Sequence, residues 1–460
     1  MANFFIAVGG TGQMVALAYW RLHQLMPWLE AAKMYHIDKD TIEHFTNVVP
    51  STFIDPLPAQ AGATVYDHFN DPTHNKMCDD ILDTLFTSSE QKTEIKTGMY
   101  GHPPVGSSVI IDRLRTGNDG ILAELLSGNP NSPSPYLKDG GQHTVVICGS
   151  AMGGTGAGGV PSIAQYIDQQ LANNRANIKI YVFYFLKHFE LPAAGAKNIN
   201  SDQITTNAKS GMCYLTDKIA KGADGCLMMG LNVSPIRRYE DVGGQTEQSH
   251  ALHILAAMYA HWVCRGGTFP AKHNAHGIEN DWHDDGFVAK NIGIEVLLKN
   301  GKTVGLDRLI QLNVAVRAFL IRLSRFINPP PKFAFVPPIP RELRRALKRL
   351  TKQTNEKLET ICAKLSTQLL AKAQEIEKII EWYEEIYQKK TAFSLQPVTE
   401  LDGKAYKKAK ISPMSVIREW CKNIKSHNDD ITALVEMLTI ALYRSLDKTF
   451  FNEYFGTYGE

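Results

Sequence analysis

The chain has 460 residues, of which 44% are hydrophobic and 21% charged, and its formal net charge is +2. This composition excludes a mainly disordered chain, and the balanced charge excludes a broad basic field, so we do not expect nucleic acid as a direct partner. The sequence has no apolar run of about 18 residues, and its start lacks the pattern of a secretory signal. Seven cysteines without a CxxC pair are typical of reduced thiols. We therefore expect a cytoplasmic protein without a membrane segment.

Short apolar runs of strand length alternate with helical segments in the first half of the chain. The strand candidates are residues 4–8, 34–37, 144–148 and 178–186. Because these runs are apolar on both faces, they favour a parallel sheet that is covered on both sides. The expected fold class is α/β, with a Rossmann-like parallel sheet and helices on both faces.

The second half of the chain is expected to be partly helical. Residues 246–264 contain helix formers without Gly or Pro and predict a central helix that follows a first domain at 1–245. A smaller α/β domain is expected at 265–340, and a mainly helical region at 341–460. Within that region, residues 341–390 predict one long amphipathic helix or a helical hairpin. Its start is basic and its end acidic, which opposes the helix dipole, so a surface for a protein partner is an alternative to a plain solvated face.

Two glycine-rich segments each follow a strand candidate and precede a helical segment. Backbone N–H groups at a helix start bind phosphate well, and glycine lets a ligand approach closely. Each segment alone is also compatible with a tight strand-to-helix turn, but two of them can flank one polyphosphate in a crevice. The candidate phosphate-binding residues are Gly10, Thr11, Gly12, Gln13, Gly153, Gly154, Thr155, Gly156, Ala157 and Gly158.

The second segment, GGTGAG at 153–158, resembles the signature of the tubulin and FtsZ superfamily, with Met152 where that family has a small residue. The first, GGTGQMVALAYW at 9–20, is similar to the first loop and helix of tubulin. Residues 98–103 lie where the family has a further glycine-rich phosphate loop. The resemblance spans about residues 1–265 and implies a tubulin-type nucleotide domain that binds GTP or GDP with Mg²⁺. It places Asp38 near the metal and phosphates.

The resemblance also implies base-binding and catalytic residues. Asn232 follows a strand-like run and is the expected guanine contact, with Gln248 and His253 of the central helix beside the base; histidines packed in a core are the alternative for that helix. In the family, a loop of one subunit enters the nucleotide pocket of the next and orients the attacking water. Glu279 and Asp281 are the candidates for that role here, and a solvated acidic loop is the alternative.

The favoured function is that of a prokaryotic tubulin-like protein. It would assemble head to tail into filaments and hydrolyse GTP on assembly, as a GTPase of low intrinsic activity. The alternative is a non-polymerising, nucleotide-bound scaffold or sensor that acts through residues 341–390. A nicotinamide-dependent oxidoreductase fits the first glycine segment but leaves the second unexplained. No resident metal site is predicted, although Cys264 and the histidines of the 273–283 loop leave zinc open as an alternative.

Overall fold

A computed structural model describes residues 2–25, 31–38, 49–54, 64–70, 79–95, 102–116, 142–171, 177–186, 223–229, 250–266 and 341–387, with shorter pieces elsewhere and gaps at 55 and 96–98. The elements that carry the site are β1 (Asn3–Val8), α1 (Gly9–Leu25), β2 (Lys33–Ile37), β3 (Ser51–Ile54), β4 (His143–Ser150), α9 (Gly154–Leu171), β5 (Ile178–Phe185) and β6 (Gly225–Met229). The others are α3 (Val65–Phe69), α4 (Asp79–Leu85), α5 (Ser88–Gln91), α6 (Pro103–Thr116), α11 (Ala251–Cys264), β7 (Trp282–His283), β8 (Gly286–Phe287), α13 (Arg341–Thr354) and α14 (Leu358–Tyr387).

The chain divides into two compact units. The first comprises residues 1–17, 31–246 and 256–293, and the second comprises residues 18–30, 247–255 and 294–460. Helices α1 and α11 each contribute to both units. The predicted domain limits at 245, 264 and 340 stay predictions, since most of residues 265–340 lies outside the described part of the chain.

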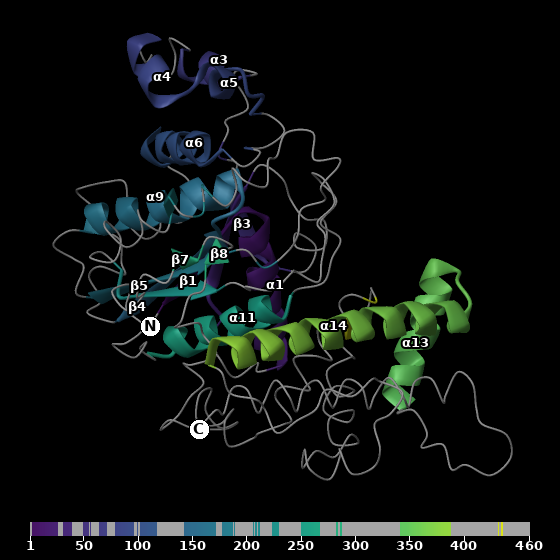
Figure 1. Cartoon of the computed structure of the whole chain (residues 1–460). Coiled ribbons are helices and arrows are strands. Elements are labelled where there is room, and N and C mark those ends of the chain that lie inside the picture. The colour runs from purple at the N-terminus through teal and green to yellow at the C-terminus, as the bar shows by residue number, and fades with distance from the viewer. Residues whose placement is uncertain are drawn as a thin grey trace, which may run out of the picture. The chain divides into compact units, whose positions relative to one another are not determined.

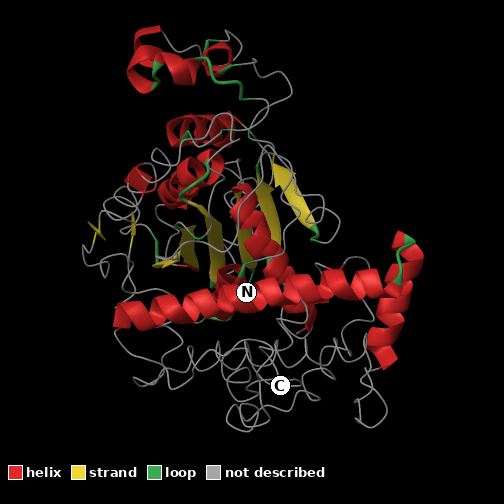
Figure 2. Ribbon diagram, turned by 45° about the vertical axis from the view of Figure 1, so that its right-hand side comes forward, coloured by secondary structure: helices red, strands yellow, loops and turns green. Residues whose placement is uncertain are grey.

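The first unit contains a six-stranded sheet in the order β3-β2-β1-β4-β5-β6, in which every neighbouring pair is parallel. Figure 2 shows these strands in yellow, side by side. All residues of β1 and β4 are buried, as expected for strands that are apolar on both faces. This confirms the predicted α/β class. The strand order reverses its direction between β1 and β4, and in such sheets the carboxyl ends of these two strands border a crevice where ligands bind.

Helix α9 covers one face of the sheet, and α6 packs on the outer side of α9 (Figure 1). The hydroxyls of Ser107 on α6 and Ser162 on α9 lie 2.6 Å apart, which fixes how the two helices meet. Further out, α3, α4 and α5 form a small helical cluster with its own apolar core. Its buried members, together with those from the start of α6, are Val65, Phe69, Leu82, Phe86, Ile95, Met99, Val105 and Val109.

The second unit contains α13 and α14, so the segment predicted as one helix or a hairpin is two helices. The break falls at Asn355, whose φ of 56° is in the left-handed region. Leu347 and Leu350 of α13 and Ile361 and Leu365 of α14 are all buried. Among the described helices, none is long and apolar enough to cross a bilayer.

Candidate functional site

The first glycine turn joins β1 to α1 without any intervening loop. The strand ends at Val8 and the helix begins at Gly9, whose φ of +71° is readily adopted only by glycine. Three residues later, a methyl group at Gly12 would lie 2.5 Å from the carbonyl oxygen of Cys148 on β4. The absence of a side chain at Gly12 therefore allows the start of α1 to lie directly against the end of β4.

The second turn joins β4 to α9 and is shaped by a serine. The Ser150 hydroxyl accepts a hydrogen bond from the Met152 N–H at 3.1 Å and donates one to the Phe185 carbonyl at 3.3 Å. Met152, the departure from the family pattern, is buried and so does not obstruct the turn. Gly153 is exposed, and a methyl group there would meet no atom within 4 Å. The surface of this turn is therefore open at Gly153.

The glycines that follow Gly153 have a packing role. A methyl group at Gly154 would lie 2.4 Å from the carbonyl oxygen of Met99, and one at Gly158 would lie 2.3 Å from that of Pro103. One at Gly156 would lie 2.6 Å from a carbonyl at the end of β4. No Cβ atom fits at such distances. Close packing of α9 is thus a second cause of the glycine density that the sequence analysis assigned to phosphate binding.

Asp38 joins the two turns. It follows β2 directly, is buried, and accepts a hydrogen bond from Gln13 Nε2 on α1 at 3.0 Å. Its other carboxylate oxygen accepts from the Thr155 hydroxyl on α9 at 3.2 Å. A carboxylate supplies oxygen atoms of the kind that hard cations prefer as ligands. The structure therefore brings three separately predicted residues into one buried cluster.

The two helix starts lie side by side where β1 and β4 end. A methyl group at Gly9 would lie 3.3 Å from the backbone nitrogen of Gly156. The first turns of α1 and α9 carry N–H groups without intrahelical acceptors, and both dipoles present their positive ends here. Residues 9–13 and 150–158 contain no Lys or Arg. The arrangement can attract an anion through backbone dipoles, without a cationic side chain in these two segments.

Two buried titratable groups beneath the site stay neutral near pH 7. His36 of β2 is fully buried, with its ring 5.2 Å from that of Phe53, and burial lowers its pKa to about 3. Burial also raises the pKa of the Cys148 thiol. Neither group adds a charge that would compete with the helix dipoles.

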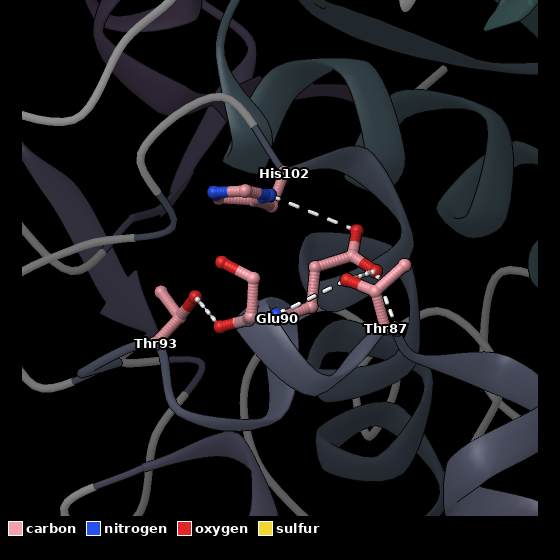
Figure 3. A network of polar contacts seen from close by, with 5 residues as sticks. Thr87, Glu90, Thr93 and His102 are labelled. Atoms are coloured by element: carbon pink, nitrogen blue, oxygen red, sulfur yellow. Dashed lines mark hydrogen bonds and ion pairs between the residues drawn. The ribbon is translucent and has the colours of Figure 1, made fainter.

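A polar network outside the site holds the segment that precedes α6 (Figure 3). Thr87 and Glu90 form a capping box at the start of α5, and the other carboxylate oxygen of Glu90 lies 3.7 Å from His102 Nδ1. The N–H of His102 donates to the Met99 carbonyl at 2.8 Å, the same oxygen that faces Gly154. Part of segment 98–103 thus lies against the start of α9, while Gly98, Tyr100 and Gly101 lie outside the described residues.

Of the remaining predicted site residues, the structure describes only His253. Asn232, Gln248, Glu279 and Asp281 lie outside the described residues. His253 is fully buried, and its Nδ1 accepts a hydrogen bond from the His250 N–H at 3.0 Å. It belongs to the second unit. Its assignment as a base contact stays a prediction.

The sequence analysis missed two residues that shape the turns. Ser150 supplies the hydrogen bonds described above, and a methyl group at Gly149 would lie 2.7 Å from the carbonyl oxygen of Val8. The signal for Ser150 was its position: a serine between a buried strand and a glycine turn commonly bonds a nearby backbone N–H. Gly149 gave no separate signal, since it is made necessary by β1, through the Val8 carbonyl, and by α9, where Val160 Cγ2 would lie 2.6 Å from the added methyl group.

Comparisons with families, curated proteins and solved structures were made for the whole chain. No family model matches the chain, and no curated protein matches it. Among solved structures, a match is described as "CetZ2 from Haloferax volcanii - GTPgS bound protofilament", at 13% identity and a TM-score of 0.30. The match covers 58% of this chain and 57% of that chain, so this chain spans little more than half of that protein's length. Similarity at this level does not establish a family.

Proposed function

We propose that this protein binds a purine nucleotide, GTP in the first place, with its phosphates over the two glycine turns. One observation carries the proposal: the turns after β1 and β4 lie side by side where the strand order reverses, and Asp38 joins them through Gln13 and Thr155. A single phosphate needs one helix start, whereas two adjacent helix starts suit the extended charge of a di- or triphosphate.

The residues divide into phosphate, metal and base contacts. The backbone of Gly10–Gln13 and Gly153–Gly158 would hold the phosphates, with the open surface at Gly153 as the entry side. Mg²⁺ would neutralise phosphate charge near Asp38, whose carboxylate lies between the two turns and offers the oxygen ligands that Mg²⁺ prefers. Asn232, with Gln248 and His253, is proposed to contact the base.

Assembly and hydrolysis form the second part of the proposal. Copies would associate head to tail, and Glu279 or Asp281 of one subunit would orient water at the γ-phosphate of the next. Such a contact is heterologous and does not close on itself, so it produces a filament. A GTPase that is completed only by a neighbour has low activity as a monomer.

The identity of the ligand is tested by denaturing the purified protein and analysing the released small molecules by chromatography and mass spectrometry. We expect GTP or GDP in amounts approaching one per chain, or uptake of added GTP by protein purified without nucleotide. A released or preferred nicotinamide dinucleotide would replace this proposal with the oxidoreductase. Failure to bind any nucleotide would reject both.

A non-polymerising scaffold is the second candidate, and the exposed cationic side of α13 favours it because that side offers a surface for a partner. Light scattering and pelleting with GTP and Mg²⁺ separate the two. Nucleotide-dependent assembly supports the filament, whereas nucleotide binding without assembly at any concentration supports the scaffold.

A further inference from the structure

Helix α13 has a cationic side that the nucleotide proposal does not use. Five exposed cations form it, and we name them the α13 basic face: Arg344, Arg345, Lys348, Arg349 and Lys352. They lie in two rows with a spacing of four residues, which is about 6 Å along a helix axis. No Asp or Glu occurs between Leu343 and Asn355. The face therefore carries a positive field that the net charge of +2 conceals.

The opposite side of α13 is already covered by protein. Ala346, Leu347 and Leu350 are at most 5% exposed. A helix that inserts into a lipid surface needs an exposed apolar side as well as its basic side. Because the apolar side of α13 is buried, an anionic membrane is a poor occupant of the basic face.

The end of α13 is held in a defined geometry. The Thr351 hydroxyl donates to the carbonyls of Leu347 and Lys348, and the Thr354 hydroxyl donates to that of Leu350. After Asn355 the chain turns into α14, where Glu356 pairs with Lys364. Among the described residues, no carboxylate pairs with Arg345, Lys348, Arg349 or Lys352. Their charges are available to a partner.

We infer that the α13 basic face binds the phosphate backbone of duplex DNA without regard to base sequence. An α-helix about 10–12 Å wide fits the major groove of B-DNA, which is about 12 Å wide. The major groove of A-form RNA is deep and narrow and excludes a helix, so DNA is the favoured duplex. Successive cations in one row, about 6 Å apart, are spaced widely enough to face different phosphates of one strand, which follow one another about every 3.4 Å along the duplex axis. The net charge of +2 led us not to expect nucleic acid as a partner. The α13 basic face differs from that expectation because its positive charges are concentrated on one side of one helix.

The test is fluorescence anisotropy of labelled duplex DNA titrated with the full-length protein at several salt concentrations. Each phosphate contact contributes about −0.9 to the slope of log K against log salt, so four or five contacts give a slope between about −3 and −5. The inference is independent of the proposed nucleotide site, so the titration is run without nucleotide. Loss of GTP binding would leave this result unchanged.

Matched double variants locate the contact. Arg345→Gln with Arg349→Gln, and separately Lys348→Gln with Lys352→Gln, each remove two charges and keep a good helix former. Each pair should reduce the magnitude of the slope by about 2. Lys92→Gln with Arg115→Gln removes two exposed charges elsewhere and should leave the slope unchanged. Circular dichroism of all variants checks that the fold is kept.

Three outcomes overturn the inference. The first is no binding to duplex DNA at low salt. The second is an equal loss in the Lys92 and Arg115 control, which would show attraction by total charge alone. The third is binding to anionic lipid vesicles or to a polyglutamate peptide that is at least as tight as binding to DNA. That result would mean that the α13 basic face binds a membrane or an acidic protein.

Discussion

At the scale of single residues, the glycines of the two turns separate into those that pack and one that faces outward. Gly12, Gly154, Gly156 and Gly158 lie where a methyl group would come within 2.6 Å of a backbone oxygen, whereas Gly153 meets nothing within 4 Å. A variant at a packed glycine would lose both stability and binding. Gly153 allows a substitution that tests the ligand without disturbing the fold.

We expect Gly153→Glu to weaken nucleotide binding while the protein stays folded. A carboxylate at the start of α9 is favourable for the helix itself but repels a phosphate, so the affinity for a fluorescent GTP analogue should fall by roughly tenfold or more. The matched Gly153→Ala variant should bind nearly as the wild type does. Equal affinities of Gly153→Glu and wild type for the GTP analogue would show that the phosphates do not bind at this turn.

His36 gives a prediction about pH. In the unfolded chain its imidazole titrates near 6.5, but burial lowers the folded pKa to about 3. Between these values the unfolded chain takes up a proton that the folded chain does not, so the free energy of unfolding falls as pH decreases below about 6.5. From pH 7 to pH 5 the wild type should lose about 2 kcal/mol more than His36→Phe in urea denaturation. The same pH dependence in both proteins would assign the effect to other groups.

At the scale of elements, the sequence was most informative where the chain is apolar. The runs at 4–8, 144–148 and 178–186 are strands because buried parallel strands need no polar face, and periodic leucines predicted the helices after residue 341. A helical hairpin was one of the two predictions for residues 341–390, but the position of the break at Asn355 was not predicted, because the residues around it have ordinary helix propensity. The position of the break depends on the backbone conformation of one residue, and the spacing of apolar residues carries no information about that conformation.

The break at Asn355 leads to a prediction about stability. Asn355 adopts a left-handed conformation that asparagine tolerates and β-branched residues do not. Asn355→Val should destabilise the α13–α14 corner by about 1–2 kcal/mol, whereas Asn355→Gly should leave it unchanged or slightly more stable. Urea denaturation followed by far-ultraviolet circular dichroism measures both. Equal stability of the valine and glycine variants would mean that the corner is not strained at this position.

At the scale of the whole molecule, the two units should respond differently to nucleotide. The two turns and Asp38 belong to the first unit, and α13 belongs to the second. A ligand at 100 times its Kd adds about 2.7 kcal/mol to the stability of the unit that binds it. In hydrogen exchange with mass spectrometry, we expect GTP to slow exchange most in β1, β4 and α9, to a smaller extent in α11, which carries the proposed base contact His253, and not in α13 and α14. Uniform slowing across the chain would indicate one cooperative unit.

The candidate site was predictable in its parts and only partly in its geometry. Gly10, Asp38 and Thr155 were each recognisable beside a strand end, because phosphate-binding turns have a local pattern. The hydrogen bonds from Gln13 and Thr155 to Asp38 depend on which strands are neighbours, and the sequence does not state the order of β2, β1 and β4. Hydrogen bonds that form only when the strands pair cannot be recognised from a local sequence pattern.

The hydrogen bond between Asp38 and Thr155 joins residues that are 117 positions apart. During synthesis, the chain emerges from its N-terminus, so the first turn leaves the ribosome long before β4 and α9 exist. Until then Asp38 lacks Thr155 as its partner, and a nascent chain that ends before Leu171 lacks α9 in its complete form. The ability to capture the phosphates of a nucleotide should therefore arise only after α9 has emerged, and nascent chains stalled before and after this point would show when it does.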